Sequence, residues 1–395
     1  MRSMFRLQNT LASNPWKTYA YRFLSSFWLI APVLIPFYRA NGLSATKVFI
    51  VQSIYLAAVL LFEIPSGYLS DVIGRRKTLI VGSLLLPVGL CVYALSYGFY
   101  GFALAEIILG IAGSMKSGTD SALMYDTLLQ LDKEKEYKAF EGKAVLFERV
   151  GDSIAAVLGG LFALVSLRFP FYLNITSGVL LIPLAISLVE PQRERISPKN
   201  PVREMIRIIT FCAGDPRIRS VILFSALVFG TEMVGIWSYY LYYGEIGLNI
   251  GYFGILLATF GVCSGYGARQ AHIIVKWMGS RSILLLLLIL SPVFMCLGSV
   301  SSAALIPLIF VNAFVWGIAG PLFTDYLNQL VASEVRATVL SINSMAGSLL
   351  FVLVSPIFGK TVDVFSLSSA YLCLGTFFLA MGLVSIFLLH RHKVL

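Results

Sequence analysis

Long apolar segments alternate with short polar segments from one end of the chain to the other. Each apolar segment holds about 20 residues, the length that a helix needs to cross the hydrocarbon core of a bilayer. The pattern predicts an all-α membrane protein with twelve transmembrane helices. Their expected ranges are 18–39, 46–68, 78–98, 101–126, 143–165, 170–189, 219–243, 250–274, 281–300, 302–329, 338–359 and 368–389.

Basic residues gather in alternate connections between these segments. One connection holds Arg75, Arg76 and Lys77, the next alternate one holds four lysines within 133–143, and the central one holds the basic residues of 193–219. Cytoplasmic loops carry an excess of Lys and Arg. We therefore expect these connections and both termini to be cytoplasmic. The net charge of +10 then reflects membrane topology, and no nucleic-acid partner is expected.

The composition agrees with a chain embedded in a lipid bilayer. Hydrophobic residues make up 58% of it and charged residues 13%, whereas soluble domains hold roughly 25% charged residues. The five cysteines are scattered, without CxxC spacing, and the three histidines have no zinc-like pattern. We therefore expect no metal and no cofactor.

The longest polar segment divides the chain into two similar halves. The predicted domains are an N-terminal six-helix bundle at 1–190, a cytoplasmic linker at 191–218 and a C-terminal six-helix bundle at 219–395. Within the linker, residues 201–212 predict an amphipathic helix, read as a tether on the membrane surface or as a regulatory element. The sequence GIAG at 110–113 recurs at 317–320, at the same place in each half, as expected for repeats related by pseudo-twofold symmetry.

The connection between the second and third predicted helices carries the most specific motif. Residues 67–77 read GYLSDVIGRRK. This resembles the signature loop of the major facilitator superfamily, G-x-L-a-D-r-x-G-R-R/K, except that Val72 stands where the family has a base. The resemblance in length, span count and central loop covers the whole chain, and it favours the efflux-like branch of secondary transporters.

The resemblance implies a cytoplasmic gate that opens and closes during transport. In the family, an acid and a base of the loop and an acid at the inner end of helix four lock this gate. Gly67 is expected to permit close helix packing, and Gly74 to form the tight turn. The alternative is a loop that merely anchors the topology. The expected gate residues are Gly67, Asp71, Gly74, Arg75, Arg76 and Asp126.

The family's proton-antiporter pattern in helix five is only partly present. Gly142, Gly151, Gly159 and Gly160 fit it, but two alanines replace its Gly-Pro pair. The arginine that the family often carries in helix four is replaced by Glu106. The small residues still predict close helix packing, while the antiporter assignment is weakened.

Several charged residues lie inside predicted spans, where an unpaired charge costs roughly 2.5–3.5 kcal/mol. Matching their depths in the membrane predicts a buried network of three ion pairs. The alternative is that these pairs only neutralise charge within the membrane and have a purely structural role. Helical spacing further predicts that Glu106, Lys116, Ser117 and Asp120 share one polar face of helix four. The pairs are Arg22–Glu63, Asp120–Arg149 and Lys116–Asp152.

Two mid-membrane carboxylates remain without an evident base, Glu106 and Glu232. Removal from water favours the protonated form of a carboxyl group. We therefore predict that Glu232 and Glu106 are the sites of proton coupling. The alternatives for each are a neutral hydrogen-bonded acid or a direct substrate contact.

In the family, helices one, four, seven and ten line a central cavity. The resemblance therefore places a further set of residues at the substrate, although core packing is the alternative for the tryptophans. These residues are Trp28, Ser117, Tyr239, Asn312 and Trp316.

The function expected from these features is secondary transport by alternating access, with proton-coupled export of a small amphipathic solute. The alternatives are proton-coupled uptake of a nutrient or siderophore, and a non-transporting receptor or scaffold. Nucleophilic catalytic combinations and a Walker-type loop are missing, so an enzyme is not expected. We expect a monomer in the bacterial inner membrane, with lipid, protons and a small molecule as partners.

Overall fold

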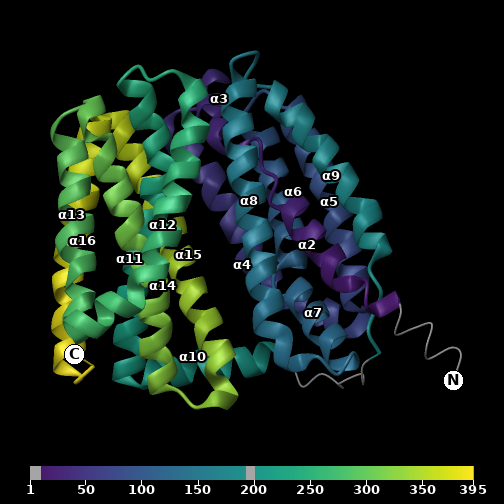
Figure 1. Cartoon of the computed structure of the whole chain (residues 1–395). Helices are drawn as coiled ribbons and strands as arrows, with labels where there is room; N and C mark the ends of the chain where they lie inside the picture. Colours follow the sequence, from purple (N-terminus) through teal and green to yellow (C-terminus); the bar gives the residue numbers. More distant parts are fainter. Residues whose placement is uncertain (1–9, 193–200, 395) are drawn as a thin grey trace, which may run out of the picture. The chain divides into compact units, whose positions relative to one another are not determined.

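The computed structural model describes residues 10–192 and 201–394, and all regular elements in these ranges are helical (Figure 1). This confirms the predicted all-α class. The helices are α2 (Asn14–Ser25), η1 (Ala31–Val33), α3 (Leu34–Ala40), α4 (Ala45–Ile73), α5 (Arg75–Leu95), α6 (Phe99–Lys116), α7 (Thr119–Gln130), η2 (Glu134–Glu136), α8 (Tyr137–Ala163), α9 (Phe169–Ser187), α10 (Pro201–Gly214), α11 (Pro216–Glu245), η3 (Ile250–Tyr252), α12 (Phe253–Met278), η4 (Gly279–Arg281), α13 (Ser282–Ser299), η5 (Ala303–Leu305), α14 (Ile306–Leu330), α15 (Ser333–Val364) and α16 (Leu367–Arg391).

Within the described residues, ten helical segments are long and apolar enough to cross a membrane. They coincide with ten of the twelve predicted ranges. The other two predicted ranges are not among these ten segments, because one is interrupted and the other carries several charged residues. The range 18–39 is divided into α2, η1 and α3, where Pro32 lacks the N–H that a continuous helix needs. The range 143–165 lies in α8, which is continuous but carries Glu148, Arg149 and Asp152. A count of twelve spans therefore stays a prediction.

The fourth predicted span, 101–126, is two helices instead of one. The chain breaks between α6 and α7, where Gly118 adopts a left-handed conformation with φ of +69°. Residues with a Cβ atom are strained at such a φ, whereas glycine adopts it readily. The prediction that Glu106, Lys116 and Asp120 share one continuous helical face is therefore wrong, because Asp120 lies in the first turn of a new helix.

The chain divides into two compact units. Unit 1 contains Met1–Phe37, Ala57–Pro201 and Ile250–Ala258, and unit 2 contains Tyr38–Leu56, Val202–Asn249 and Thr259–Leu395. Four helices are divided between the units: α3 after Phe37, α4 after Leu56, α10 after Pro201 and α12 after Ala258. The predicted domain boundaries, by contrast, divide the chain into consecutive ranges and assign each helix to one domain.

In unit 1, small residues bring helices into close contact. The helix α2 packs against α8, α9 and α7, and α5 packs against α6 and α9. A Cβ atom at Gly151 would lie 2.6 Å from the carbonyl oxygen of Phe23, and one at Gly159 would overlap that of Leu29. Gly151 and Gly159 thus permit the close packing predicted for them, whereas a Cβ atom at Gly142 would meet open space.

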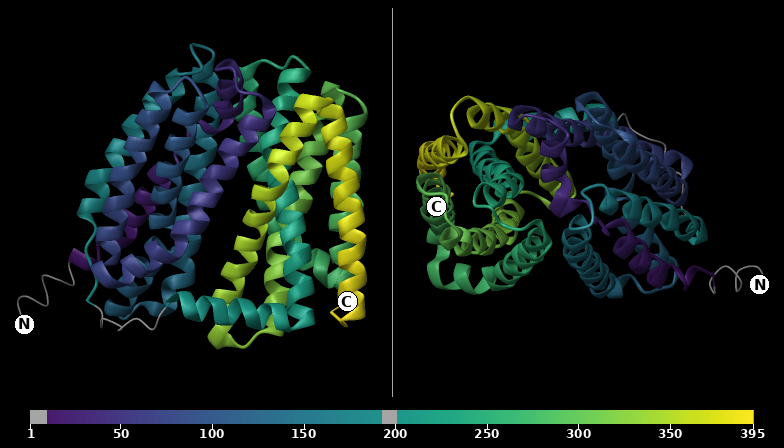
Figure 2. Two further views of the ribbon diagram at one scale, coloured as in Figure 1. Left: turned by 180° about the vertical axis from the view of Figure 1, so that it is seen from behind. Right: turned by 90° about the horizontal axis from the view of Figure 1, so that it is seen from above.

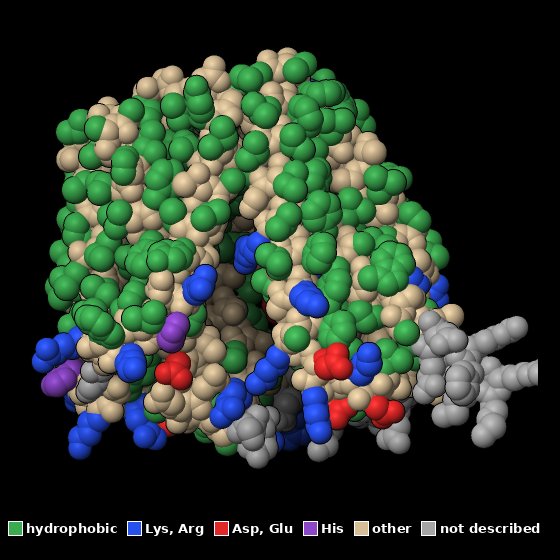
Figure 3. Space-filling model, in the orientation of Figure 1, with side chains coloured by type: hydrophobic (Ala, Val, Ile, Leu, Met, Phe, Trp, Pro, Cys, Tyr) green, Lys and Arg blue, Asp and Glu red, His purple; other side chains and the backbone are tan. Residues whose placement is uncertain are grey.

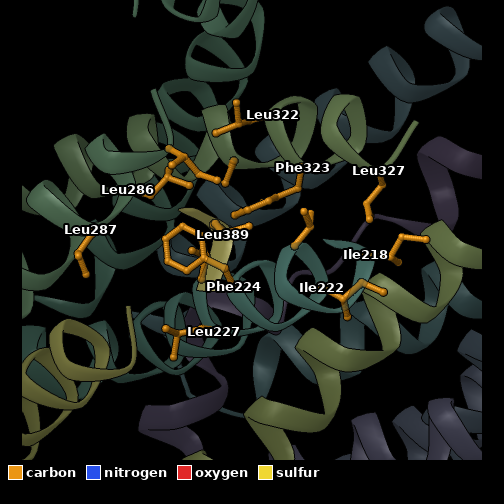
Figure 4. Packing of buried hydrophobic residues seen from close by; sticks show 14 of the residues in the cluster. Ile218, Ile222, Phe224, Leu227, Leu286, Leu287, Leu322, Phe323, Leu327 and Leu389 are labelled. Atoms are coloured by element: carbon orange, nitrogen blue, oxygen red, sulfur yellow. The ribbon is translucent and has the colours of Figure 1, made fainter. Parts of the chain in front are cut away.

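Unit 2 has a continuous apolar core built by α11, α13, α14 and α16 (Figure 4). Phe224 of α11 meets Phe323 of α14 edge to face, with ring centroids 5.7 Å apart. Leu286 and Leu389 enter the same cluster from α13 and α16. This core holds α11 and α14 in fixed register, and these two helices carry the site described below.

The amphipathic helix predicted at 201–212 is present as α10, which runs across the end of unit 2 where the chain also ends (Figure 2). Ile208 and Cys212 enter the core of unit 2, whereas Ile206 and Ile209 are exposed. In unit 2, charged side chains gather at this same end (Figure 3). Residues 193–200 of the predicted linker lie outside the described residues.

Candidate functional site

The centre of α11 carries a buried carboxyl group, that of Glu232, in a cluster of polar side chains. Glu232 is 0% exposed. Its Oε1 accepts a hydrogen bond from the Tyr239 hydroxyl at 3.2 Å, and its Oε2 accepts one from Asn312 Nδ2 at 2.6 Å. Asn312 Nδ2 also lies 2.7 Å from the Tyr239 hydroxyl oxygen. The three side chains therefore form a closed triangle between α11 and α14.

The helical repeat explains how this triangle forms. Tyr239 follows Glu232 by seven residues, close to two helical turns, so both project from the same side of α11. No ion pair involves Glu232 in the described part of the chain. Its oxygens are satisfied by neutral donors alone, so either protonation state can be held without breaking a salt bridge.

Aromatic rings lie beside the triangle. Phe260 of α12 contacts both Tyr239 and Trp316, with ring centroids 6.2 and 6.0 Å apart. Phe229 lies 6.2 Å from Trp316 on another side. Asn312 Oδ1 and Trp316 Nε1 are buried and lack a hydrogen-bond partner among the described atoms. Three of the predicted substrate residues, Tyr239, Asn312 and Trp316, are thus brought together in unit 2.

The other two predicted substrate residues, Trp28 and Ser117, belong to unit 1. Trp28 donates its indole N–H to the carbonyl oxygen of Ser25 at 2.9 Å. Ser117 is exposed at the break between α6 and α7. No hydrogen bond joins Trp28 to Ser117 in the described part of the chain.

The second predicted proton site, Glu106, is buried in unit 1 between α5 and α6. It is 4% exposed, and its Oε1 accepts a hydrogen bond of 2.5 Å from the Tyr93 hydroxyl. Tyr93 is itself held by Phe102 and Phe171, with ring centroids 5.8 and 5.6 Å away. The carboxyl group therefore faces the neighbouring helix α5.

The buried charge network has other pairs than the predicted ones. Arg22 binds Asp120 at 2.9 Å and Glu141 at 2.7 Å, and it also donates to Ser121 at 2.6 Å. The predicted pair Arg22–Glu63 does not form, because α2 packs against α7 and α8. Glu141 was not singled out in the sequence, where it is one more acid near the start of a span.

The two other predicted pairs are also wrong. Asp120 is already bound to Arg22, which leaves Arg149 to pair with Asp152 at 3.7 Å on the exposed side of α8. Lys116 forms no ion pair among residues 10–192 and 201–394. Depth along a span was the only basis for these pairings, and it does not say which helix lies next to which.

The signature loop is held by two carboxylates. Asp126 of α7 binds Arg75 at 2.5 Å, which is the base and acid pair that the family resemblance implies. Arg75 also donates to the carbonyl oxygen of Ala122. Glu190, just after α9, accepts hydrogen bonds from the backbone N–H groups of Arg75 at 2.9 Å and Arg76 at 2.7 Å. Glu190 was missed, because only its position in space brings it to the start of α5.

The glycines of the loop differ in what they do. Gly74 has a φ of +115°, and a Cβ atom there would lie 3.2 Å from the Glu190 carboxyl group. It therefore serves the turn as predicted. A Cβ atom at Gly67 would meet open space, so the close packing expected of Gly67 is absent from this structure. Asp71 is exposed near the end of α4, and Arg76 donates to the carbonyl oxygen of Ile186 at 2.6 Å.

A bundle of long apolar helices, with a base and acid pair at the signature loop and a carboxyl group buried in each unit, is typical of secondary transporters. Residues 23–356 match the sequence profile of the Major Facilitator Superfamily, and the chain belongs to this family. Members of the family are transporters and not enzymes. The chain is therefore a multi-pass membrane protein of a transporter family, as predicted.

Relatives within the family share a limited part of the sequence. The Quinolone resistance protein NorA of Staphylococcus aureus is 24% identical over 203 residues, which are 51% of this chain and 51% of that protein. The Uncharacterized MFS-type transporter EfpA of Mycobacterium tuberculosis is 29% identical over 131 residues, 33% of this chain and 24% of that protein. The match thus spans about half the length of NorA.

Solved structures share the fold over nearly the whole chain. The nucleoside transporter NupG superposes with a TM-score of 0.78 at 11% identity, covering 97% of this chain and 98% of its own. The D-xylose-proton symporter superposes with a TM-score of 0.68 at 15% identity, covering 96% and 97%. At these identities the likeness concerns the fold.

Proposed function

We propose that this protein exports a small amphipathic molecule in exchange for protons, by alternating access between two six-helix bundles. The observation that carries the proposal is the Glu232–Tyr239–Asn312 triangle. A carboxyl group removed from water and held by neutral donors can load and release a proton without leaving a base unpaired. Intramembrane carboxyl groups in transporters commonly serve as proton relays.

The aromatic rings beside the triangle suit an amphipathic solute. Tyr239, Phe260 and Trp316 supply aromatic rings, and the buried, unpartnered Asn312 Oδ1 and Trp316 Nε1 supply one acceptor and one donor that a solute could meet when the site opens. Because NorA is named for quinolone resistance, a quinolone is the first probe to try. The loop ion pair Arg75–Asp126 supports a gate that breaks and reforms during transport.

The proposed topology has twelve spans, with both termini in the cytoplasm of a bacterial inner membrane, and the working unit is a monomer. Ten segments span by length and hydropathy, and α8 and the α2–α3 segment supply the other two. Labelling of single cysteines from each side of the membrane tests this arrangement. Accessibility of the α8–α9 and α10–α11 connections from the same side would contradict it.

The test of coupling uses purified protein in liposomes that contain a pH-sensitive dye. Addition of the fluorescent quinolone norfloxacin should move protons in the wild type. Glu232→Gln should abolish this proton movement while norfloxacin binding survives. Glu245→Gln, the same change at the exposed end of the same helix, is the matched control and should behave as the wild type. Glu106→Gln shows whether the second buried acid is the carrier instead.

The alternatives give other outcomes. Uptake by symport would move norfloxacin or a nutrient in the same direction as the proton, and the sign of the dye signal separates this from exchange. A receptor or scaffold would bind a ligand without counterflow of labelled solute. Solute movement that is independent of protons in the wild type and in both glutamine variants would refute proton coupling.

A further inference from the structure

The first turn of α4 is held by a carboxylate that lies more than 300 residues away in sequence. Asp363 Oδ1 accepts a hydrogen bond from the backbone N–H of Ala45 at 2.8 Å, and Oδ2 accepts one from the N–H of Thr46 at 2.8 Å. The Thr46 hydroxyl donates a third, at 2.6 Å. The N–H groups of a first helical turn have no partner within their own helix. Asp363 therefore caps two N–H groups of α4 from another helix, beside Ser44, whose Oγ accepts the N–H of Lys47 at 3.4 Å.

Asp363 is poorly placed for its own helix. It lies in the last turn of α15, whose final residue is Val364. An acidic side chain is unfavourable at a helix C-terminus and favourable at an N-terminus, because of the partial charges at the two ends. Its interactions with α4 offset this cost. The position of Asp363 is thus explained by α4 and not by α15.

Below the cap, the two helices touch along a continuous strip. Ser53 Oγ and Ser355 Oγ are hydrogen-bonded at 2.8 Å, and Phe49 meets Phe358 edge to face with centroids 5.2 Å apart. A Cβ atom at Gly359 would lie 2.7 Å from the carbonyl oxygen of Ala45. The contacting residues recur about every four positions on each helix, so one face of α4 fits one face of α15.

The helix α4 is therefore anchored at both ends. Its N-terminus is capped by Asp363, and its C-terminus leads directly into the signature loop, where Arg75 binds Asp126. The first anchor lies in unit 2 and the loop lies in unit 1, since α4 changes unit after Leu56.

We propose that Asp363 is a positioning residue for transport, a releasable latch on the N-terminus of α4 that must open during each cycle. This rests on the proposed alternating access, in which the two sequence halves move relative to each other. The latch holds the conformation described here, and its release frees α4 to move with the signature loop at its other end.

The opening of the latch can be measured without a substrate. Ser355 is 0% exposed, so Ser355→Cys reacts with maleimide only when α4 and α15 separate. Ser291→Cys is the matched control, because Ser291 is also 0% exposed in unit 2 but contacts α16 through Gly375. Both are made in a background whose five native cysteines are replaced by alanine, with and without Asp363→Ala.

Asp363→Ala removes the three hydrogen bonds that this carboxylate accepts and should raise the labelling rate of Ser355→Cys on the order of fivefold, the factor expected when alanine replaces a capping side chain. The labelling rate of Ser291→Cys should stay unchanged. An unchanged rate at both sites would refute the latch. An equal rise at both sites would also refute it, since it would reflect general loosening of unit 2.

A second experiment keeps Asp363 and closes the latch covalently. The double variant Ser53→Cys/Ser355→Cys should form a disulfide on oxidation, stop norfloxacin export, and regain it on reduction, whereas each single variant should be insensitive to oxidation. Export that continues in fully cross-linked protein would overturn the need for opening. If the wild type moves no norfloxacin, the proposed export fails, and the labelling rates alone decide whether Asp363 holds α4.

Discussion

Replacing Arg22 by methionine should destabilise the protein strongly, because it leaves Asp120 buried without its counter-charge. The side chains of Arg22 and Asp120 are only 4% and 8% exposed. Removing one partner of a buried pair costs about 3–5 kcal/mol, since the remaining charge keeps its desolvation penalty. Glu141 loses its partner as well, but its side chain is 27% exposed and can turn to water.

A double-mutant cycle isolates the contact from the rest of the change. We expect Arg22→Met to cost about 4 kcal/mol and Asp120→Asn somewhat less, with the double variant less destabilised than their sum by about 2 kcal/mol. The free energy of unfolding would be measured in detergent micelles by denaturant titration. Near-additive costs, within about 0.5 kcal/mol, would refute the described pair.

The same cycle separates the described partner from the one predicted by depth. Glu63 forms no ion pair in the described part of the chain. Arg22→Met combined with Glu63→Gln should therefore give additive costs. A coupling of about 2 kcal/mol in this control cycle would favour the depth-based pair over the described one.

Three further changes test other parts of the structure. Glu190→Ala should cost about 1 kcal/mol, as expected for a lost cap, and speed hydrogen exchange of the first amides of α5. Gly317→Ala should cost about 1–3 kcal/mol of unfolding free energy, because its Cβ would overlap a carbonyl oxygen of α12, whereas Gly320→Ala meets open space and should be near neutral. Ile208→Asp should lower the thermal midpoint by several degrees, because it places a charge in the core of unit 2, while Ile206→Asp on the exposed side of α10 should change it little. Equal effects within either pair would contradict the described packing.

Some of the candidate site could be predicted because it depends on one helix alone. The seven-residue step from Glu232 to Tyr239 places both on one side of α11, whatever surrounds the helix. The pairing of Arg75 with Asp126 joins two helices and was implied only by the resemblance of the loop to the family's signature. The contact of Asn312 with Glu232 depends on how α14 lies beside α11, and neither spacing nor hydropathy contains that information.

Other features could not be predicted because they join distant segments. Glu190 and Asp363 are acids near span ends, and nothing in their neighbours shows which helix N-terminus each one caps. The break at Gly118 was also missed, since a glycine within an apolar run is compatible with a continuous helix.

The sequence by itself determined the membrane class, the all-α fold and the family. In a bilayer every backbone polar group must be satisfied within the protein, so long apolar runs become helices regardless of their neighbours. Only the tertiary structure decided which charges pair, which acids cap which helices and where α4 is anchored. Hydropathy specifies depth along a helix, whereas partners depend on which helices are neighbours and which faces they turn to each other, and packing of the whole bundle sets both.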